Sequence, residues 1–348
     1  MPQTYYISTF GCQMNKNDSE HLAGLLEFNG CQPAENPETA NILVLNTCAV
    51  RDKAERRVYG QLEKFNYLRR IKKRDQKIFL SGCMPAYDRA EIKKRAPFLD
   101  GFLEITEARR YPPRRVDAPE AWVTIMQGCN NCCAYCIVPQ ARGRERSRGA
   151  AEILAEIQQI DFRRRAVLFL LGQNVNSYAG EFQGQKISFS RLLELVLQKC
   201  LTVPKLAFLT SHPKDLSDEL ISVIARNEKI DREIHLPVQH GSDRILRLMQ
   251  RGYTIKHYLA LLEKIRANIP SAKISTDIIV GFPGETDEEF QDTYELVRAA
   301  GFFRVNTAGF SARRGTAAAA FPPLEQKVIN ERLNKLNSCI NSLKEVSK

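Results

Sequence analysis

The sequence has no long hydrophobic run. None of its apolar stretches approaches the roughly 18 residues that a membrane-spanning helix needs. Its beginning, Met1 to Thr4, also lacks the basic and apolar zones of a signal peptide. We therefore expect a cytoplasmic protein without membrane association. In such a compartment a set of ten cysteines indicates metal ligands among them rather than disulfides, because thiols are kept reduced there.

The composition indicates a folded, basic protein. Hydrophobic residues make up 43% of the 348 residues and charged residues 26%, as in ordinary globular proteins, and the length suggests about two domains. Lys and Arg (51) outnumber Asp and Glu (40), which gives a net charge of +11. This excess favours a polyanionic partner, although it also serves solubility.

Three cysteines, called here the motif cysteines, stand in a C-x3-C-x2-C spacing after a strand-like segment: Cys129, Cys133 and Cys136. Thiolates are the usual ligands of iron–sulfur clusters, and three ligands on four irons leave one iron with an open position. The motif therefore predicts an enzyme that binds S-adenosylmethionine at the open iron and cleaves it to a radical. The alternatives are a zinc knuckle and buried free cysteines. Against the knuckle, the nearest histidine, His212, is far away in sequence.

A second set, the strand-end cysteines, follows three predicted strands: Cys12, Cys48 and Cys83. The strands are expected at Tyr5–Thr9, Ile42–Asn46 and Lys77–Ser81, with helices at Lys16–Asn29, Arg51–Arg70 and Ala86–Arg95. This alternation predicts a parallel α/β sheet, whose strand carboxyl ends share one edge. Asn17, with Glu20 three positions later, is predicted to be the N-cap and capping box at the start of the first helix. The three thiols are thus predicted to hold a second cluster. Alternatively, they are merely buried, as we expect for Cys31, Cys200 and Cys339.

The rest of the chain predicts a second α/β domain. We divide the chain into an N-terminal domain (1–108), a linker (109–120), a barrel (121–322) and a C-terminal helix (323–348). Six strands are fewer than the eight of a closed barrel, so we expect a partial (β/α)6 barrel. These strands are Trp122–Gln127, Ala166–Leu171, Lys205–Thr210, Ile234–Pro237, Lys273–Val280 and Arg304–Phe310.

Polar residues and glycines follow these strands, where ligands of such barrels bind. Gln173, Asn174 and Gln239 are candidates for ribose hydroxyl groups, and Ser211 lies in an equivalent loop. Tyr135 and the turn at Gly281 could contact adenine. The turn from Gly281 to Glu285 is equally compatible with a simple strand-to-helix connection.

Two basic segments are candidate nucleic-acid surfaces. Residues 51–74 hold ten basic and three acidic side chains, with Tyr59, Phe65 and Tyr67 among them, and Arg142, Arg144, Arg146 and Arg148 alternate after the motif cysteines. Basic residues neutralise phosphates and exposed aromatics stack on unpaired bases. We expect the four arginines to share one face of an extended loop. Solvated helix faces are the alternative, with Tyr59 and Phe65 in the core.

The motifs together resemble those of the MiaB-type methylthiotransferases over essentially the whole chain. The resemblance rests on Thr9–Glu20, Asn46–Glu55, Gly128–Pro139, Leu171–Tyr178, Leu236–Gln239, Thr276–Thr286 and Arg314–Thr316. It implies a radical S-adenosylmethionine (SAM) enzyme that adds a methylthio group at C2 of N6-dimethylallyladenosine beside the tRNA anticodon. Alternatives are a sister enzyme acting on threonylcarbamoyladenosine or a ribosomal protein, and a non-catalytic zinc-stabilised RNA-binding protein.

The resemblance also implies cofactors and partners. It implies two 4Fe–4S clusters, one on the motif cysteines that cleaves SAM and one on the strand-end cysteines that carries the sulfur to be inserted. The implied partners are the tRNA anticodon stem-loop and an electron donor such as flavodoxin or ferredoxin, and we expect a monomer. Cys132 is expected to be a bystander. Such proteins usually carry a C-terminal TRAM domain that binds tRNA, which this sequence, ending at Lys348 after a helix, does not include. Either the sequence is a fragment, or its RNA affinity comes from the basic segments.

Overall fold

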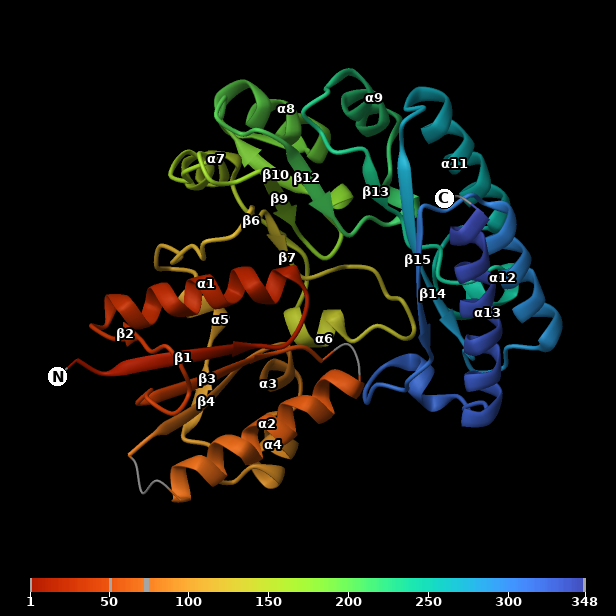
Figure 1. Cartoon of the computed structure of the whole chain (residues 1–348). Coiled ribbons are helices and arrows are strands. Elements are labelled where there is room, and N and C mark those ends of the chain that lie inside the picture. Colours follow the sequence, from red (N-terminus) through yellow and green to blue (C-terminus); the bar gives the residue numbers. More distant parts are fainter. Residues whose placement is uncertain (1, 50–51, 72–74, 347–348) are drawn as a thin grey trace. The chain divides into compact units, whose positions relative to one another are not determined.

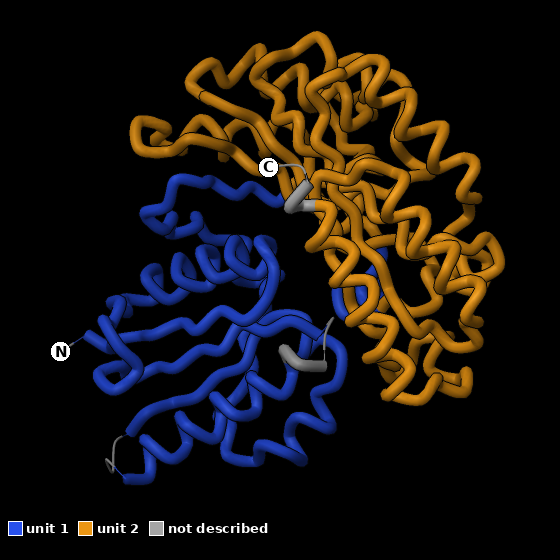
Figure 2. The backbone as a smooth tube through the Cα atoms, turned by 45° about the vertical axis from the view of Figure 1, so that its right-hand side comes forward, with its two compact units in different colours: residues 1–124, 137–144 blue, residues 125–136, 145–348 orange. Residues whose placement is uncertain are grey.

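The computed structural model describes residues 2–49, 52–71 and 75–346. The chain forms two compact units (Figure 2), one of residues 1–124 and 137–144 and the other of residues 125–136 and 145–348. Residues 137–144 therefore belong to the first unit, although they follow the motif cysteines. The predicted linker at 109–120 stays a prediction. No helix within the described residues is long and apolar enough to cross a membrane.

The first unit is built on a parallel five-stranded sheet in the order β2-β1-β3-β4-β5. Its strands are β1 (Thr4–Thr9), β2 (Gln32–Pro33), β3 (Ile42–Thr47), β4 (Lys77–Gly82) and β5 (Gly101–Leu103). The register pairs Thr9 with Asn46 and Thr47 with Gly82. The three predicted strands are therefore present, and they are direct neighbours.

Helices cover both faces of this sheet, with α1 (Gln13–Phe28) on one side and α2 (Asp52–Ile71) on the other (Figure 1). Because successive strand residues point to opposite faces, Ile42 and Val44 of β3 pack in one core cluster with Leu22 of α1. Leu43 and Leu45 pack in the other core cluster, with Val58, Leu62 and Phe65 of α2. The apolar run from Ile42 to Leu45 in β3 is thus explained by burial on both faces.

The start of α1 differs from the prediction. The helix begins at Gln13 with Cys12 as its N-cap, and the Cys12 N–H donates to Asn15 Oδ1 at 3.3 Å. Asn17 is buried inside the helix, where its Nδ2 donates to the Trp122 carbonyl at 3.0 Å and to Glu20 Oε2 at 3.2 Å. The polar pair that suggested a helix start therefore makes interior hydrogen bonds instead.

The remaining elements of the first unit are short. They are α3 (Cys83–Tyr87), α4 (Arg89–Arg95), α5 (Ile105–Ala108), β6 (Glu120–Thr124) and α6 (Val138–Arg142). The strand predicted at Trp122–Gln127 is divided into β6 and β7 (Met126–Gln127). By its packing β6 belongs to the first unit, since Asn17 of α1 also accepts a hydrogen bond from Thr124 Oγ1 at 2.7 Å.

In the second unit, strands alternate with helices as predicted. β9 pairs in parallel with β12, and β14 pairs in parallel with both β13 and β15. An isolated bridge joins Leu206 of β12 to Ile230, close before β13. The strands are β7, β8 (Arg146–Ser147), β9 (Val167–Leu171), β10 (Ala179–Phe182), β11 (Gln185–Ser188), β12 (Leu206–Leu209), β13 (Glu233–His235), β14 (Lys273–Val280) and β15 (Arg304–Gly309).

The helices of the second unit are amphipathic or capped as their sequences suggest. α8 and α9 begin at the serine N-caps Ser188 and Ser217, and α12 begins with a capping box of Thr286 and Glu289. The helices are α7 (Ala150–Gln158), α8 (Phe189–Lys199), α9 (Asp218–Arg226), α10 (Asp243–Leu248), α11 (Ile255–Asn268), α12 (Asp287–Ala299) and α13 (Gln326–Val346). In Figure 1, α11, α12 and α13 lie beside β14 and β15.

Candidate active site

The strand-end cysteines lie at the carboxyl ends of three neighbouring strands. Cys12 follows β1 and caps α1, Cys48 comes directly after β3, and Cys83 comes directly after β4. Since these strands pair in the order β1-β3-β4, the three residues share one edge of the sheet. Cys48 and Cys83 are buried, Cys12 is exposed, and none of the three forms a disulfide.

The backbone before Cys83 depends on a glycine. Gly82 has a φ of 92°, and a Cβ there would lie 2.4 Å from the Thr47 carbonyl oxygen. Any side chain would therefore push β4 away from β3 and displace Cys83. Around the same edge Asn15 Nδ2 donates to Asn46 Oδ1 and to the Thr47 carbonyl, each at 3.2 Å. These buried hydrogen bonds fix the loops that carry Cys12 and Cys48.

An arginine with a buried side chain contacts one of the strand-end cysteines, Cys83. Arg142 of α6 donates from Nε to Cys83 Sγ at 3.1 Å and from Nη2 to Asp18 Oδ2 at 2.8 Å. Arg109 binds the other oxygen of Asp18 at 2.6 Å. Burial alone would raise the pKa of Asp18, but Arg142 and Arg109 hold it below its usual range. Burial raises the pKa of the Cys83 thiol, and Arg142 opposes this increase.

The motif cysteines lie in the loop after β7, and a second arginine contacts them. Arg251 Nη1 donates to Cys133 Sγ at 3.4 Å, and the Asn131 N–H donates to Cys129 Sγ at 3.4 Å. Burial raises the pKa of Cys129, and the Asn131 N–H opposes this increase. Cys132 is exposed, and its thiol is turned to the Asn130 carbonyl at 3.8 Å.

Arg251 was not anticipated from the sequence, because 118 residues separate it from Cys133. It is buried, donates to the Pro237 carbonyl at 2.9 Å and to Tyr253 Oη at 2.9 Å, and lies 3.4 Å from Tyr135 Oη. No short-range sequence signal marks such a residue. Its guanidinium joins the motif-cysteine loop to the segment after β13.

The predicted SAM contacts lie past the carboxyl ends of their strands. Gln173 and Asn174 follow β9, Ser211 follows β12, Gln239 lies beyond β13 and Gly281 directly follows β14. Asn174, Ser211 and Gln239 are buried. Asn174 Nδ2 donates to Asp215 at 2.6 Å, whereas Asn174 Oδ1 and Ser211 Oγ have no hydrogen-bond partner within the described structure. Buried polar atoms left without partners are suited to hydrogen bonds from a ligand.

Backbone strain marks the same loops. Thr210 has a φ of 72° and Gln239 a φ of 76°, conformations that side-chain-bearing residues rarely adopt. Thr210 directly precedes the predicted contact Ser211, and Gln239 is itself a predicted contact. Strained backbone of this kind costs about 1–3 kcal/mol and gathers at functional sites. This observation, which the sequence does not reveal, agrees with the position of the loops past the strand ends.

Gly281 has contacts that limit its predicted role. Its φ is 75°, a Cβ there would lie 2.5 Å from Ile329 Cγ1 of α13, and its N–H donates to Glu285. The glycine is therefore required by the approach of α13 and by the strand-to-helix turn. Its N–H is already used within the protein.

The donor sets fit iron–sulfur clusters. Each set offers three cysteines that form no disulfide, and one sulfur of each set is contacted by a buried guanidinium that would balance the negative charge of thiolates. In residues 2–49, 52–71 and 75–346, no three His, Cys, Asp or Glu side chains converge closely enough to hold a single metal ion. A four-iron cluster needs a wider arrangement, because each thiolate binds a different iron.

The basic segments differ from expectation. The four arginines do not share a face: Arg142 is buried in α6 and Arg148 is bound by Glu152 and Glu156, while Arg144 and Arg146 are exposed. In α2, Phe65 is in the core and Tyr59 is half-buried under Arg95, so Tyr67 is the exposed aromatic, at 63%. Positions 51 and 72–74 of the predicted segment lie outside the described residues.

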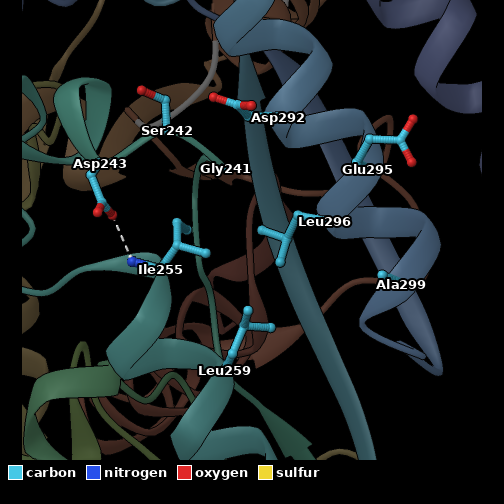
Figure 3. Close-up of a pocket in the computed structure, with 9 residues that line it drawn as sticks. All are labelled: Gly241, Ser242, Asp243, Ile255, Leu259, Asp292, Glu295, Leu296 and Ala299. Carbon is cyan, nitrogen blue, oxygen red and sulfur yellow. Dashed lines mark hydrogen bonds between the residues drawn. The ribbon is translucent and has the colours of Figure 1, made fainter.

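A pocket of about 570 Å³ lies elsewhere in the second unit (Figure 3), between α10, α11 and α12. Its lining includes Asp243, Leu259 and Glu295, and Asp243 accepts a hydrogen bond from the Ile255 N–H at 2.7 Å. No cysteine and none of the predicted SAM contacts lines it. We therefore assign it no part in the reaction.

Comparison with known families defines the class of this protein. Residues 123–297 match the Radical SAM superfamily, and residues 4–104 match a family described as "Uncharacterized protein family UPF0004". The structure is also similar to the radical S-adenosylmethionine methyltransferase TsrM from Kitasatospora setae, with a TM-score of 0.66 over 92% of this chain and 77% of that chain. At 13% identity this similarity concerns the fold alone, and it confirms the predicted fold class.

Sequence relatives define the family more narrowly. A tRNA-2-methylthio-N(6)-dimethylallyladenosine synthase of Thermotoga petrophila is 44% identical over 90% of this chain and 76% of the relative. Another from Caldicellulosiruptor saccharolyticus is 43% identical over 98% of this chain and 78% of the relative. The chain therefore belongs to the tRNA-2-methylthio-N(6)-dimethylallyladenosine synthase family. This membership confirms the predicted transferase class and its cofactors, SAM and iron–sulfur clusters.

Proposed function

We propose that this protein adds a methylthio group to C2 of N6-dimethylallyladenosine next to the anticodon of tRNA. Its membership in a family whose members carry that name is the observation that carries the proposal. The C2–H bond has no useful acidity, so a base cannot activate it. When bound, SAM at an iron–sulfur cluster supplies a radical that can activate this bond. The protein positions the reactants.

We assign one 4Fe–4S cluster to Cys129, Cys133 and Cys136. The neighbouring Arg251, 3.4 Å from Cys133 Sγ, supports the assignment because it brings a buried positive charge to the thiolates. For SAM we propose contacts with Tyr135, Gln173, Asn174, Ser211, Gln239 and Gly281. The unpartnered Asn174 Oδ1 and Ser211 Oγ support this set, since both are buried. Gly281 would contribute its carbonyl and not its N–H.

We assign the second cluster, called here the auxiliary cluster, to Cys12, Cys48 and Cys83. The shared sheet edge and the contact of Arg142 with Cys83 support this assignment. With three protein ligands for four irons, one iron would be open to the sulfur that is inserted. Cys132 is proposed to take no part, because the C-x3-C-x2-C spacing is complete without it.

The proposed partners follow from the reaction. The substrate is the anticodon stem-loop, where an unpaired base enters a pocket at little unstacking cost. A flavodoxin or ferredoxin would supply the electrons. We propose a monomer that acts in the cytoplasm, where thiols stay reduced. The net charge of +11 and the exposed basic face of α2 favour tRNA binding.

Two cysteine variants test the separate roles proposed for the two clusters. Cys133→Ala is expected to abolish 5′-deoxyadenosine formation, whereas Cys48→Ala is expected to retain it and lose the methylthio product. Both products are measured by mass spectrometry after anaerobic reconstitution. Cys132→Ala is the matched control for Cys133→Ala, because Cys132 lies beside that proposed ligand. Cys31→Ala is the matched control for Cys48→Ala, because both cysteines are buried in the first unit. Methylthiolated product from Cys48→Ala would refute the auxiliary cluster.

Nucleoside analysis tests the substrate. In tRNA from cells that lack the protein, the methylthio mark on dimethylallyladenosine should disappear and return on complementation. Loss of the mark on threonylcarbamoyladenosine instead would indicate the sister activity. A colourless, zinc-bearing protein after anaerobic purification would indicate the non-catalytic alternative.

A further inference from the structure

Arg142 occupies a position that its place in the sequence does not suggest. It follows the motif cysteines by only six residues, yet it packs in the first unit and contacts Cys83. Its side chain is 6% exposed and that of its partner Asp18 is fully buried. One planar guanidinium thus joins a buried carboxylate, at 2.8 Å from Nη2, to a thiol, at 3.1 Å from Nε.

We propose that Arg142 is a positioning residue of the auxiliary cluster, which orients Cys83 and favours the reduced state of the cluster by N–H···S bonding and positive charge. This inference rests on the proposed assignment of Cys12, Cys48 and Cys83. Hydrogen bonds to sulfur and local net charge are two of the means by which proteins set cluster potentials. A cation beside the cluster stabilises the form that carries one more electron.

The charges around Arg142 leave a surplus on its side of the cluster. Asp18 is bound by two guanidinium groups, Arg142 at 2.8 Å and Arg109 at 2.6 Å. Its single negative charge balances only one of their two positive charges, so one positive charge remains. Cys83 Sγ lies 3.1 Å from Arg142 Nε, so a cluster bound through Cys83 would face this charge directly. Burial keeps water from screening these interactions, which makes them stronger than on a surface.

Arg109 provides a matched comparison. It binds the same carboxylate from the other side and also donates to Thr124 Oγ1 at 3.2 Å. Removing either arginine takes away one cation from Asp18, but of these two arginines only Arg142 has a described contact with a cysteine sulfur. A lysine at position 142 would keep the charge but could not present two N–H groups in the fixed fork of a guanidinium.

The experiment uses the full chain with Cys129, Cys133 and Cys136 replaced by alanine, so that the auxiliary cluster is the remaining one. Arg142→Gln, Arg142→Lys and Arg109→Gln are made in this background and reconstituted anaerobically. Iron and sulfide content, circular dichroism and the midpoint potential from an electron-paramagnetic-resonance redox titration are measured. None of these readouts depends on turnover.

We expect Arg142→Gln to lower the equilibrium constant for one-electron reduction at least tenfold, which corresponds to a midpoint potential about 59 mV more negative. Arg142→Lys should shift the potential in the same direction but less, and Arg109→Gln should shift it least. Loss of iron from Arg142→Gln, with an unchanged circular dichroism spectrum and normal iron in Arg109→Gln, would also support the positioning role. If Arg142→Gln does not fold, the potentials of Arg142→Lys and Arg109→Gln are compared instead. A larger negative shift in Arg142→Lys supports the inference, and an equal or smaller one contradicts it.

Two results would overturn the inference in distinguishable ways. Equal shifts in the Arg142 and Arg109 variants, or no shift in either, would show that Arg142 serves Asp18 and not the cluster. Absence of iron in the background protein, with Arg142 unchanged, would refute the proposed ligand set itself.

Discussion

His212 is a buried imidazole whose two nitrogens have different surroundings. Nδ1 accepts a hydrogen bond from the Lys214 N–H at 3.3 Å, and Nε2 has no hydrogen-bond partner in the described structure. Burial, together with Arg251 and Lys214, lowers the pKa of His212 to about 3. The ring is therefore neutral at physiological pH and, with Nδ1 accepting, carries its proton on Nε2.

Because of the lowered pKa of His212, we predict that the unfolding free energy decreases on acidification. Below about pH 6.5 the unfolded chain binds a proton at His212, while the folded protein does not until the pH approaches 3. Since the unfolded state then binds more protons, stability falls as pH drops through this window, by up to about 1.4 kcal/mol per pH unit. Between about pH 7 and pH 5, wild type should lose about 2 kcal/mol more unfolding free energy than His212→Phe.

Urea unfolding of both proteins at the two pH values measures this difference. Phenylalanine retains the ring that lies 5.7 Å from Tyr253 but cannot ionise. His257→Gln, an exposed residue of α11, should behave as wild type. An identical pH dependence in wild type and His212→Phe would contradict the prediction.

At the residue scale, the sequence predicts functional residues that directly follow a strand. It does not predict those whose roles depend on tertiary contacts. The strand-end cysteines were predictable because each follows the strand of a recognisable β/α unit. Arg142 was not, because it contacts Cys83 across 59 residues and Asp18 across 124. Arg251 and the strained Thr210 belong to the same group, since their roles depend on packing that no local pattern encodes.

At the element scale, a buried charge network ties α13 to the turn after β14. Arg332 of α13 donates to Glu285 Oε2 at 2.8 Å, and Glu285 Oε1 lies 3.0 Å from His240 Nε2. Glu285 and His240 are fully buried and the Arg332 side chain is 8% exposed. Because Glu285 also accepts the Gly281 N–H, the network holds the loop in which SAM contacts are proposed.

Arg332→Met is therefore expected to destabilise the protein by about 3–5 kcal/mol, because it leaves the Glu285 carboxylate buried without its cation. The midpoint of urea unfolding measures the effect. Arg298→Met is the matched control, since its ion pair with Glu295 is more than half exposed and such pairs contribute about 1 kcal/mol or less. Equal shifts for the two variants would show that the network does not stabilise α13.

The elements that sequence reasoning missed are short ones. The hairpin of β10 and β11 turns at Gln183 and Gly184, which have φ values of 52° and 79°. A two-residue turn of this kind is usually recognised by Asn-Gly or Asp-Gly, so Gln-Gly gave a weak signal. The long amphipathic helices and the apolar strands were predictable because burial imposes their periodicity.

At the scale of the whole molecule, the excess of positive charge bears on tRNA binding. Along α2, Arg57, Lys64 and Arg70 are exposed together with Tyr67, while Val58, Leu62 and Phe65 pack in the core. The basic residues therefore occupy the solvent face of a helix whose opposite face is buried. A polyanion bound there would release counterions, so its affinity would fall steeply with salt.

We predict that neutralising this face weakens tRNA binding and makes it less dependent on salt. The triple variant Arg57→Gln, Lys64→Gln, Arg70→Gln should lower the slope of log affinity against log salt by about two, because each lost phosphate contact removes about 0.7–0.9. Binding is measured by fluorescence anisotropy with labelled tRNA over a range of salt concentrations. Neutralising Lys186, Lys199 and Lys256, three exposed cations of the second unit, removes the same charge and should leave the slope unchanged. If both triple variants lower the slope equally, tRNA responds to net charge and α2 is not its contact surface.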